Sequence, residues 1–213
     1  MDSLLYGPDG PSESDLRLLG DVRGKRVVEL GCGTGASSIA LARSGAVVIC
    51  IDASADKLAG ARRLAEKEGV RLETRRAEPG SMPFLAADSV DAVLSIYSLG
   101  HPEEADRVFR QAQRVLRPGA ALIVSVAHPV RLMLDGSDDE PDESSGLTYF
   151  DEGGQREARE RRYRHTVESL FSALCRSGHR VDALLEPRPR GGGAATTSKI
   201  PQTLILRARK MGA

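Results

Sequence analysis

The sequence predicts an α/β protein with a doubly wound, mostly parallel sheet of seven strands, in which the last strand is antiparallel. From Val27 to Val126, short apolar runs alternate with segments whose apolar residues recur at helical spacing, which is typical of repeated strand–helix–strand units. The run Val47–Ile51 is entirely apolar, as expected for a strand covered on both faces. No helical segment separates the last two strand-like runs, so we expect them to pair as a hairpin.

Local signals place the individual elements. Ser54 can cap a helix that Gly69 stops, and Pro102 suits the first turn of another helix that Pro118–Gly119 ends. Thr166 can cap a late helix. The expected helices cover residues 11–19, 37–44, 54–68, 102–116 and 166–177. The expected strands are residues 27–30, 47–51, 70–75, 90–97, 120–126, 181–185 and 203–206.

The length of 213 residues suits one domain with small additions. We expect a single domain over residues 1–213, with an N-terminal cap segment at 1–24 and an insertion at 128–164. This insertion is polar and carries a cluster of acidic residues within 138–143. Long irregular stretches in compact domains are usually functional lids or disordered loops, so we predict a lid.

Composition restricts the partners. The 30 basic and 30 acidic residues cancel, so a nucleic-acid partner is not expected and a small molecule is. No apolar run is long enough to cross a bilayer, and the N-terminus lacks the pattern of a signal peptide. The three cysteines are widely spaced, form no metal-binding pair and fit reduced thiols in a cytoplasmic protein. A homodimer is left open.

A glycine-rich segment, Glu29–Gly35, stands where the first strand meets the first helix of the sheet. Glycines there permit unusual backbone angles and the close approach of a ligand. Asp52 ends the second strand, 21 residues beyond Gly31, where a carboxylate can accept both hydroxyl hydrogens of a ribose. The same glycines, together with Ala36, also satisfy the dinucleotide pattern of nicotinamide enzymes. A nicotinamide-dependent reductase therefore stays an alternative.

Three features favour S-adenosylmethionine over a dinucleotide. Glu29 stands two residues before the first glycine, Gly31, and the third glycine, Gly35, follows the second after only one residue. The helix before the fifth strand ends in the segment Leu116–Gly119. The chain closes with a hairpin, where a dinucleotide-binding dehydrogenase would continue with parallel strand–helix–strand units.

Taken together, these motifs resemble those of the class I S-adenosylmethionine-dependent methyltransferases over nearly the whole chain. The matching segments are Glu29–Gly35, Asp52, Glu78–Phe84, Asp91–Ser98 and Arg114–Gly119. A bacterial small-molecule subgroup is also similar at Tyr6–Pro8, Glu13–Leu19, His128–Pro129, Tyr149–Asp151 and Leu185–Pro187. One departure is Pro79, which has no N–H where the family often uses a backbone amide to bond adenine. Another is Ala120, which replaces a second glycine after Pro118–Gly119.

The resemblance implies a Rossmann-like methyltransferase fold and S-adenosylmethionine as cofactor. It places Gly31, Gly33 and the backbone near Ser95 against the methionine half of the cofactor. Asp52 and Ala53 would face the ribose, and Glu78 the adenine. The full set of implied cofactor-binding residues is Tyr6, Glu29, Gly31, Cys32, Gly33, Gly35, Asp52, Ala53, Glu78, Pro79 and Ser95.

Three histidines are candidate catalytic bases, because imidazole accepts a proton near neutral pH. His128 directly follows the fifth strand, His101 follows the fourth, and His165 precedes the late helix. A surface or structural role is the alternative for each. Three tyrosines could line the acceptor pocket: Tyr97, Tyr149 and Tyr163. Cys32 suits a small buried position in a tight turn better than a nucleophilic role.

The function expected from these residues is methyl transfer from S-adenosylmethionine to a small-molecule acceptor, with a secondary metabolite as one candidate. A cofactor-binding enzyme that does not methylate, such as a cyclase, stays an alternative, as does a non-catalytic module. The acids Glu29 and Asp52 argue against the non-catalytic module, since a scaffold does not need them. RNA methylation is disfavoured because the chain carries no net charge.

Overall fold

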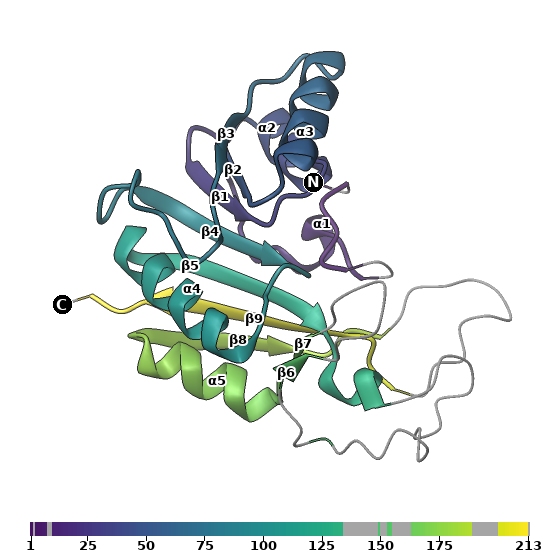
Figure 1. Cartoon of the computed structure of the whole chain (residues 1–213), viewed down its shortest axis with the longest axis vertical. Coiled ribbons are helices and arrows are strands. Elements are labelled where there is room, and N and C mark those ends of the chain that lie inside the picture. The colour runs from purple at the N-terminus through teal and green to yellow at the C-terminus, as the bar shows by residue number, and fades with distance from the viewer. Residues whose placement is uncertain are drawn as a thin grey trace, which may run out of the picture.

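A seven-stranded sheet, in the order β3-β2-β1-β4-β5-β9-β8, forms the centre of the protein (Figure 1). The computed structural model describes residues 1, 3–7, 10–133, 149, 153–154, 163–188 and 200–212. The strands of this sheet are β1 (Arg26–Leu30), β2 (Val47–Asp52), β3 (Glu73–Arg76), β4 (Val90–Ile96), β5 (Leu116–Ala127), β8 (His179–Leu185) and β9 (Thr203–Lys210). The α-helices are α1 (Glu13–Leu16), α2 (Ala36–Arg43), α3 (Ala55–Lys67), α4 (Pro102–Val115) and α5 (Val167–Arg176).

The strand pairings confirm the predicted fold class. The pairs β1–β2, β2–β3, β1–β4 and β4–β5 are parallel. The pairs β5–β9 and β8–β9 are antiparallel, so the last strand alone runs against the others (Figure 1). The chain leaves β1 toward β2 and β3, then crosses back to β4 on the other side of β1. In such sheets, ligands bind in the crevice at the carboxyl ends of the two strands where the order reverses, here β1 and β4.

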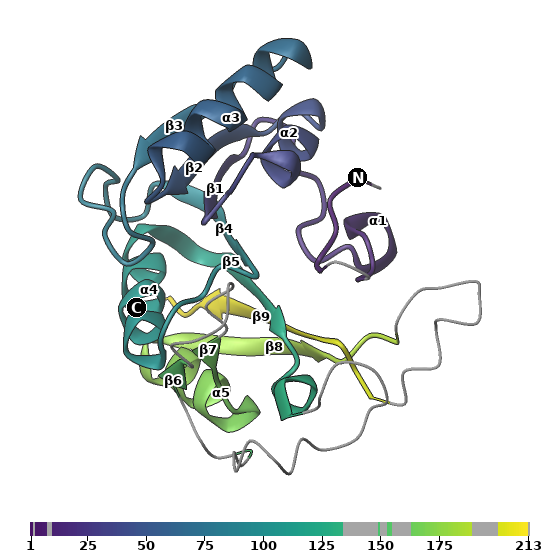
Figure 2. The same ribbon diagram turned by 45° about the vertical axis from the view of Figure 1, so that its right-hand side comes forward.

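Helices and the N-terminal segment cover the two faces of the sheet. On one face, α4 and α5 pack side by side on a core that includes Val28, Ile51, Phe109 and Leu174 (Figure 1). The other face is covered by α2, α3 and the N-terminal segment, and Figure 2 shows α1 and α2 on the opposite side from α5. The central strands β1, β2, β4 and β5 are mostly buried on both faces and read as apolar runs, which made them predictable, whereas the edge strands β3 and β8 are partly exposed.

The helix caps follow the sequence signals. The Ser54 side chain accepts a hydrogen bond from Lys57 N–H, and Thr166 forms a capping box with Ser169 at the start of α5. Pro102 is the first residue of α4, where the missing proline N–H costs nothing. Val115 ends α4, three residues before Pro118, as expected from the stop signal.

Five elements differ from their predicted bounds by two or more residues. Residues 17–19 are not helical, because Arg17 adopts a left-handed conformation (φ 50°) that ends α1. β3 begins at Glu73, three residues later than predicted. β5 begins at Leu116, because Leu116 pairs with Val90 while Ala121 pairs with Ala92, so the segment 117–120 bulges out of the ladder. β8 and β9 each extend beyond the predicted hairpin, to His179 and Lys210.

A buried carboxylate organises the predicted N-terminal cap segment. Glu13 is 3% exposed and accepts hydrogen bonds from the N–H groups of Leu18, Leu19 and Gly20 at 2.9–3.0 Å, and from the Tyr6 hydroxyl. The Ser125 hydroxyl on β5 donates a hydrogen bond to the Tyr6 carbonyl. These bonds tie the segment to the carboxyl half of β5.

Only parts of the predicted lid fall within the described residues. Pro129–Met133 forms a 3-10 helix, and Gly153–Gly154 (β6) pairs antiparallel with Tyr163–Arg164 (β7), so these parts of 128–164 are not irregular. The acidic centre at 138–143 lies outside the described residues, and the lid stays a prediction. Among the helices of the described ranges, none has the length and apolar composition needed to cross a membrane.

Candidate active site

The turn between β1 and α2 is held in an unusual backbone conformation. Gly31, Gly33 and Gly35 have φ values of 63°, 54° and 84°. Side chains rarely adopt this left-handed region, so glycine suits all three positions. Cys32 N–H donates to the Ile51 carbonyl on β2 (3.1 Å), and Gly35 N–H donates to the Cys32 carbonyl (2.9 Å). The turn therefore folds over the carboxyl end of the sheet.

Gly31 and Gly33 are required for different reasons. A Cβ on Gly31 would stand 2.3 Å from the Ser98 Cβ, so close packing against the segment after β4 excludes a side chain. Ser98 fixes this contact by donating to the Leu30 carbonyl (2.6 Å) and by bonding to the hydroxyl of Ser95 (2.8 Å). A Cβ on Gly33 would meet no atom of the described chain within 4 Å. Internal packing therefore does not exclude a side chain at Gly33, whereas a ligand approaching the turn would.

Asp52 connects the end of β2 to this turn. Its side-chain oxygen Oδ2 accepts the Gly33 N–H at 3.0 Å, and Oδ1 accepts the Ser54 N–H at 2.9 Å. Each carboxylate oxygen has a second lone pair. The residue is 6% exposed, so the carboxylate is fixed in place and retains acceptor capacity for further donors.

Glu29 is buried beneath the turn and does not line its surface. It is 4% exposed and accepts a hydrogen bond from the Ser38 hydroxyl on α2. Burial raises the pKa of Glu29 to about 7, although hydrogen bonds from Ser38 and Ser37 act to lower it. Ser38 also accepts from the Cys50 thiol (2.8 Å), so a polar chain runs from Glu29 to β2.

The segment after β3 crosses the end of β2. Ala77 N–H donates to the Asp52 carbonyl (3.2 Å), and a tight turn closes where Ser81 N–H donates to the Glu78 carbonyl (2.8 Å). Glu78 is exposed, and its carboxylate makes no hydrogen bond or ion pair with another described residue. Ala53 is exposed beside this turn. The structure thus brings Asp52, Ala53 and Glu78 to the same edge of the sheet as the glycines.

Besides Glu29, two further predicted cofactor residues have side chains that point inward. Tyr6 is fully buried and donates its hydroxyl to Glu13; burial, helped by Glu13, raises its pKa. Cys32 is 6% exposed, and a hydrogen bond with Cys50, followed by burial, raises the pKa of its thiol. A protonated thiol is a poor nucleophile, which fits the expectation of a small buried residue.

The three candidate bases already have partners. His128 is 3% exposed; its Nε2 lies 2.8 Å from the Glu186 Oε1, and its Nδ1 accepts the Val130 N–H at 3.2 Å. His165 bonds through Nε2 to the Gly100 carbonyl (2.9 Å), and His101 caps α4 by accepting the Glu103 N–H (3.4 Å). The structure brings His101 and His165 together around Gly100. His128 shares none of these partners, because it bonds to Glu186 and Val130.

The carboxyl ends of β4 and β5 form a second polar group next to His128. Tyr97 directly follows β4 with a positive φ of 51°, and its hydroxyl forms a hydrogen bond with Thr203 Oγ1 at 2.6 Å. Non-glycine residues with such φ values cluster at functional sites. Gln202 accepts the His128 N–H on its backbone carbonyl (2.9 Å) and the Arg131 guanidinium on its side chain (2.8 Å). Tyr149 accepts the Val167 N–H through its hydroxyl, while the Tyr163 side chain lies outside the described atoms.

Sequence reasoning missed the roles of Ser98 and Glu186. Ser98 lay at the end of a recognised motif, but only the Cβ contact with Gly31 shows that it shapes the turn. Glu186 stands 58 residues from His128, so no local pattern could pair the two side chains. In the described parts of the chain, no group of three or more His, Cys, Asp or Glu side chains is placed to hold a metal ion.

Comparisons with known proteins agree with this geometry. Residues 27–119 match the family model described as a methyltransferase domain. The chain is 38% identical over 125 residues to a demethylmenaquinone methyltransferase of Clavibacter sepedonicus, covering 57% of this chain and 50% of that protein. It is 36% identical over 102 residues to a ubiquinone biosynthesis O-methyltransferase of Hahella chejuensis, covering 48% and 43%. The chain thus spans about half the length of the curated relatives it matches.

Solved structures extend the similarity to nearly the whole chain. An S-adenosylmethionine dependent methyltransferase from Mesorhizobium loti is 26% identical with a TM-score of 0.76, covering 92% of this chain and 96% of that one. A Listeria monocytogenes protein at 23% identity shares the fold with a TM-score of 0.77, covering 94% and 96%. The matched segment, 27–119, contains β1, the glycine turn, Asp52 and Glu78. Residues 27–119 therefore match the methyltransferase-domain family, and nearly the whole chain has the fold of S-adenosylmethionine-dependent methyltransferases.

Proposed function

We propose that this protein binds S-adenosylmethionine at the carboxyl ends of β1, β2 and β4 and transfers its methyl group to a small organic acceptor. The observation that carries the proposal is the joining of Gly33 to Asp52. This hydrogen bond places the buried Asp52 carboxylate, which can accept further hydrogen bonds, beside the glycine turn. At Gly33 a side chain would meet no other atom of the described chain within 4 Å, so a ligand has room to approach. A nucleoside with two ribose hydroxyls fits such a combination.

In this proposal each edge of the site holds a different part of the cofactor. Gly31 and Gly33, supported by the Ser95–Ser98 pair, approach the methionine half with backbone atoms. Asp52 and Ala53 face the ribose. The unpartnered carboxylate of Glu78 faces the adenine, and because Pro79 has no N–H, Glu78 carries more of the adenine contact. We assign no cofactor contact to the phenol of Tyr6, because Glu13 engages it in the interior.

Bound S-adenosylmethionine supplies an activated methyl group on a sulfonium centre. The remaining task of the chain is to align the acceptor atom and to take its proton. Alignment can contribute roughly 7–11 kcal/mol, and a positioned base about 10²–10⁴-fold. His128 is the base proposed from the sequence, and the structure adds Glu186, whose half-exposed carboxylate is bonded to the imidazole. Because the Val130 N–H and Glu186 engage both ring nitrogens of His128, we propose that the half-exposed Glu186 carboxylate receives the proton, and that the Nε2–H of His128 holds this carboxylate in position.

The small-molecule acceptor is supported by the relatives and by charge. One relative is named a demethylmenaquinone methyltransferase and another a ubiquinone biosynthesis O-methyltransferase, so both names concern quinones and neither names a nucleic acid or a protein as acceptor. The chain has no net charge to attract nucleic acid. We extend the proposal to a cytoplasmic location, because the free thiols of Cys32, Cys50 and Cys175 would then stay reduced.

The test is methyl transfer from trideuteromethyl-labelled S-adenosylmethionine to a panel of phenols, catechols and hydroquinones and to a small-molecule cell extract, read by mass spectrometry. We expect one or more products heavier by a labelled methyl group, absent with Asp52→Ala. In parallel, calorimetry should show binding of S-adenosylhomocysteine but of neither NAD nor NADP. Binding of S-adenosylhomocysteine without any transfer would favour the non-methylating alternative. Binding of NAD in its place would overturn the proposal.

A further inference from the structure

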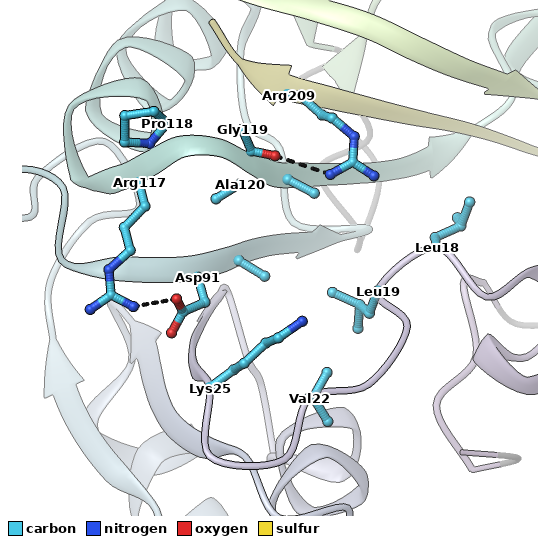
Figure 3. Close-up of a pocket in the computed structure, with 12 residues that line it drawn as sticks. Leu18, Leu19, Val22, Lys25, Asp91, Arg117, Pro118, Gly119, Ala120 and Arg209 are labelled. Atoms are coloured by element: carbon cyan, nitrogen blue, oxygen red, sulfur yellow. Dashed lines mark hydrogen bonds and ion pairs between the residues drawn. The ribbon is translucent and has the colours of Figure 1, made fainter. Parts of the chain in front are cut away.

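A second cavity lies at the opposite end of the sheet from the candidate active site. Its volume is about 280 Å³. It is lined by the segment before β1, by the amino ends of β4 and β5, and by Arg209 near the end of β9 (Figure 3). β4 has seven residues, and a strand rises about 3.3 Å per residue, so roughly 20 Å separate the two ends. The cavity therefore does not belong to the cofactor site.

One side of the cavity is apolar. Leu18, Leu19 and Val22 line it from the N-terminal segment, and Ala92 and Ala121 from the sheet. Ala92 and Ala121 are register partners on β4 and β5, and their short side chains leave the space between the strands and the segment. Hydrogen bonds hold the segment in place, since Leu18 N–H and Leu19 N–H donate to the Glu13 carboxylate.

Two of the three cations at the rim are matched by carboxylates. Arg117 forms an ion pair with Asp91, which also accepts the Arg26 N–H at 2.8 Å. Burial acts to raise the pKa of Asp91, but the Arg26 N–H, Arg117 and the nearby charge of Lys25 outweigh it and hold this pKa below its usual range. Arg209 donates to the Asp182 Oδ2 at 2.6 Å and to the Gly119 carbonyl at 3.0 Å.

The third cation, Lys25, acts on Asp91 through its charge but makes no ion pair of its own with a described residue. Its side chain points into the cavity between Asp91 and Leu19 (Figure 3). Its ammonium makes no hydrogen bond or ion pair with any residue that the structure describes. The cavity thus combines an apolar wall with an excess of positive charge, because Lys25 and Arg117 share the single carboxylate of Asp91.

We propose that this cavity binds a small organic monoanion, namely a carboxylate carried by an apolar ring or short chain. The carboxylate would lie against Lys25 at the rim, and the apolar part against Leu19, Val22 and Ala92. The excess of one cation over the shared Asp91 carboxylate favours a ligand with one negative charge, and the apolar wall favours a hydrocarbon body over inorganic phosphate or sulfate. The volume lies at the small end of ligand pockets, which limits the ligand to about one or two rings.

The test uses naphthoate as the probe, titrated into the isotopically labelled full chain and followed by amide chemical shifts and calorimetry. We expect shift changes at Leu19, Val22, Lys25 and Ala92, with none at residues 31–35. Lys25→Met keeps the apolar stem and should weaken naphthoate binding at least about tenfold, because hydrogen bonds to charged groups exceed 1.4 kcal/mol. Lys67→Met removes an equally exposed ammonium at the end of α3 and should leave the affinity unchanged.

Three results would overturn the proposal. Naphthamide, the uncharged analogue, should bind at least tenfold more weakly, so equal affinity would remove the role of charge. Sulfate binding as tightly as naphthoate would remove the role of the apolar wall. Shift changes confined to the glycine turn, or none up to millimolar probe, would show that the cavity is not a binding site. Leu19→Trp adds bulk to the cavity wall and provides a second variant that should abolish binding.

Discussion

The Gly33 backbone N–H and the Asp52 carboxylate lie 3.0 Å apart and form a hydrogen bond that joins the turn after β1 to the end of β2. The bond orients a carboxylate that is 94% buried without using all of its lone pairs. It also stabilises a glycine whose φ of 54° is unfavourable for other residues. Turn geometry and ligand recognition therefore depend on the same pair of residues.

Replacing Asp52 by alanine should weaken S-adenosylhomocysteine binding by about 10- to 100-fold, because losing a charged acceptor costs about 1.5–3 kcal/mol. The melting temperature should also fall, since Gly33 N–H and Ser54 N–H each lose a partner. Calorimetry measures the affinity. Asp56→Ala is the matched control, because it removes an exposed carboxylate four residues away. Equal affinity of Asp52→Ala and the wild type would remove Asp52 from the cofactor site.

Replacing Gly33 by valine should abolish cofactor binding while the fold persists. The side chain would project where no atom of the described chain stands, and it would block a ligand that approaches the turn. The backbone penalty of about 1–2 kcal/mol should lower the melting temperature by a few degrees. Gly69→Val is the control, because Gly69 has a φ of 66° and equally open surroundings at the end of α3. Normal cofactor binding by Gly33→Val would make the turn a packing device only.

The buried carboxylate of Glu29 should make stability depend on pH. Burial raises its folded-state pKa from 4.5 to about 7, so the folded state binds a proton more tightly than the unfolded state does. This tighter proton binding contributes up to about 3 kcal/mol to the free energy of unfolding. The contribution is complete below about pH 4.5 and is lost as the pH rises through 7. Chemical unfolding should therefore show Glu29→Gln gaining on the wild type between pH 5 and pH 8. For Glu66→Gln, at an exposed position, the curve of unfolding free energy against pH should run parallel to that of the wild type. A parallel curve for Glu29→Gln would refute the raised pKa of Glu29.

Changes at the His128–Glu186 pair should separate turnover from cofactor binding. We expect His128→Ala and Glu186→Gln to lower the rate of labelled methyl transfer by 10²-fold or more, with S-adenosylhomocysteine affinity changed less than threefold. The physical reason is that the cofactor is held at β1 and β2, while this pair lies beyond β5 and β8. If His128→Ala lost cofactor affinity and transfer equally, or melted at a much lower temperature, the histidine would be a structural residue.

Much of the fold was predictable because local signals and burial agree. Helix α3 lies between its cap at Ser54 and the stop signal at Gly69. Strand β2 reads as an apolar run because both of its faces are covered. The end of α1 was not predictable, because the left-handed Arg17 follows from Glu13 capturing the next backbone N–H groups. The start of β5 depends on the register between Val90 and Leu116, which is a non-local pairing.

The site was predictable where its residues are close in sequence to strand ends. The glycine turn and Asp52 meet at the same edge of the sheet because parallel strands end together. The inward direction of Glu29 and Tyr6 was not predictable, since it depends on Ser38 and Glu13 as partners. Likewise, the bond between His128 Nε2 and Glu186 depends on a partner 58 residues away, which only the tertiary structure brings into place.

A crystal structure of the protein with S-adenosylhomocysteine tests the central claim most directly. The account predicts both ribose hydroxyls within hydrogen-bonding distance of the Asp52 carboxylate, the methionine half along Gly31 and Gly33, and the adenine beside Glu78. It also predicts that the Gly33–Asp52 hydrogen bond persists in the complex. A ligand bound away from the carboxyl ends of β1 and β2, or a ribose with no contact to Asp52, would contradict the account.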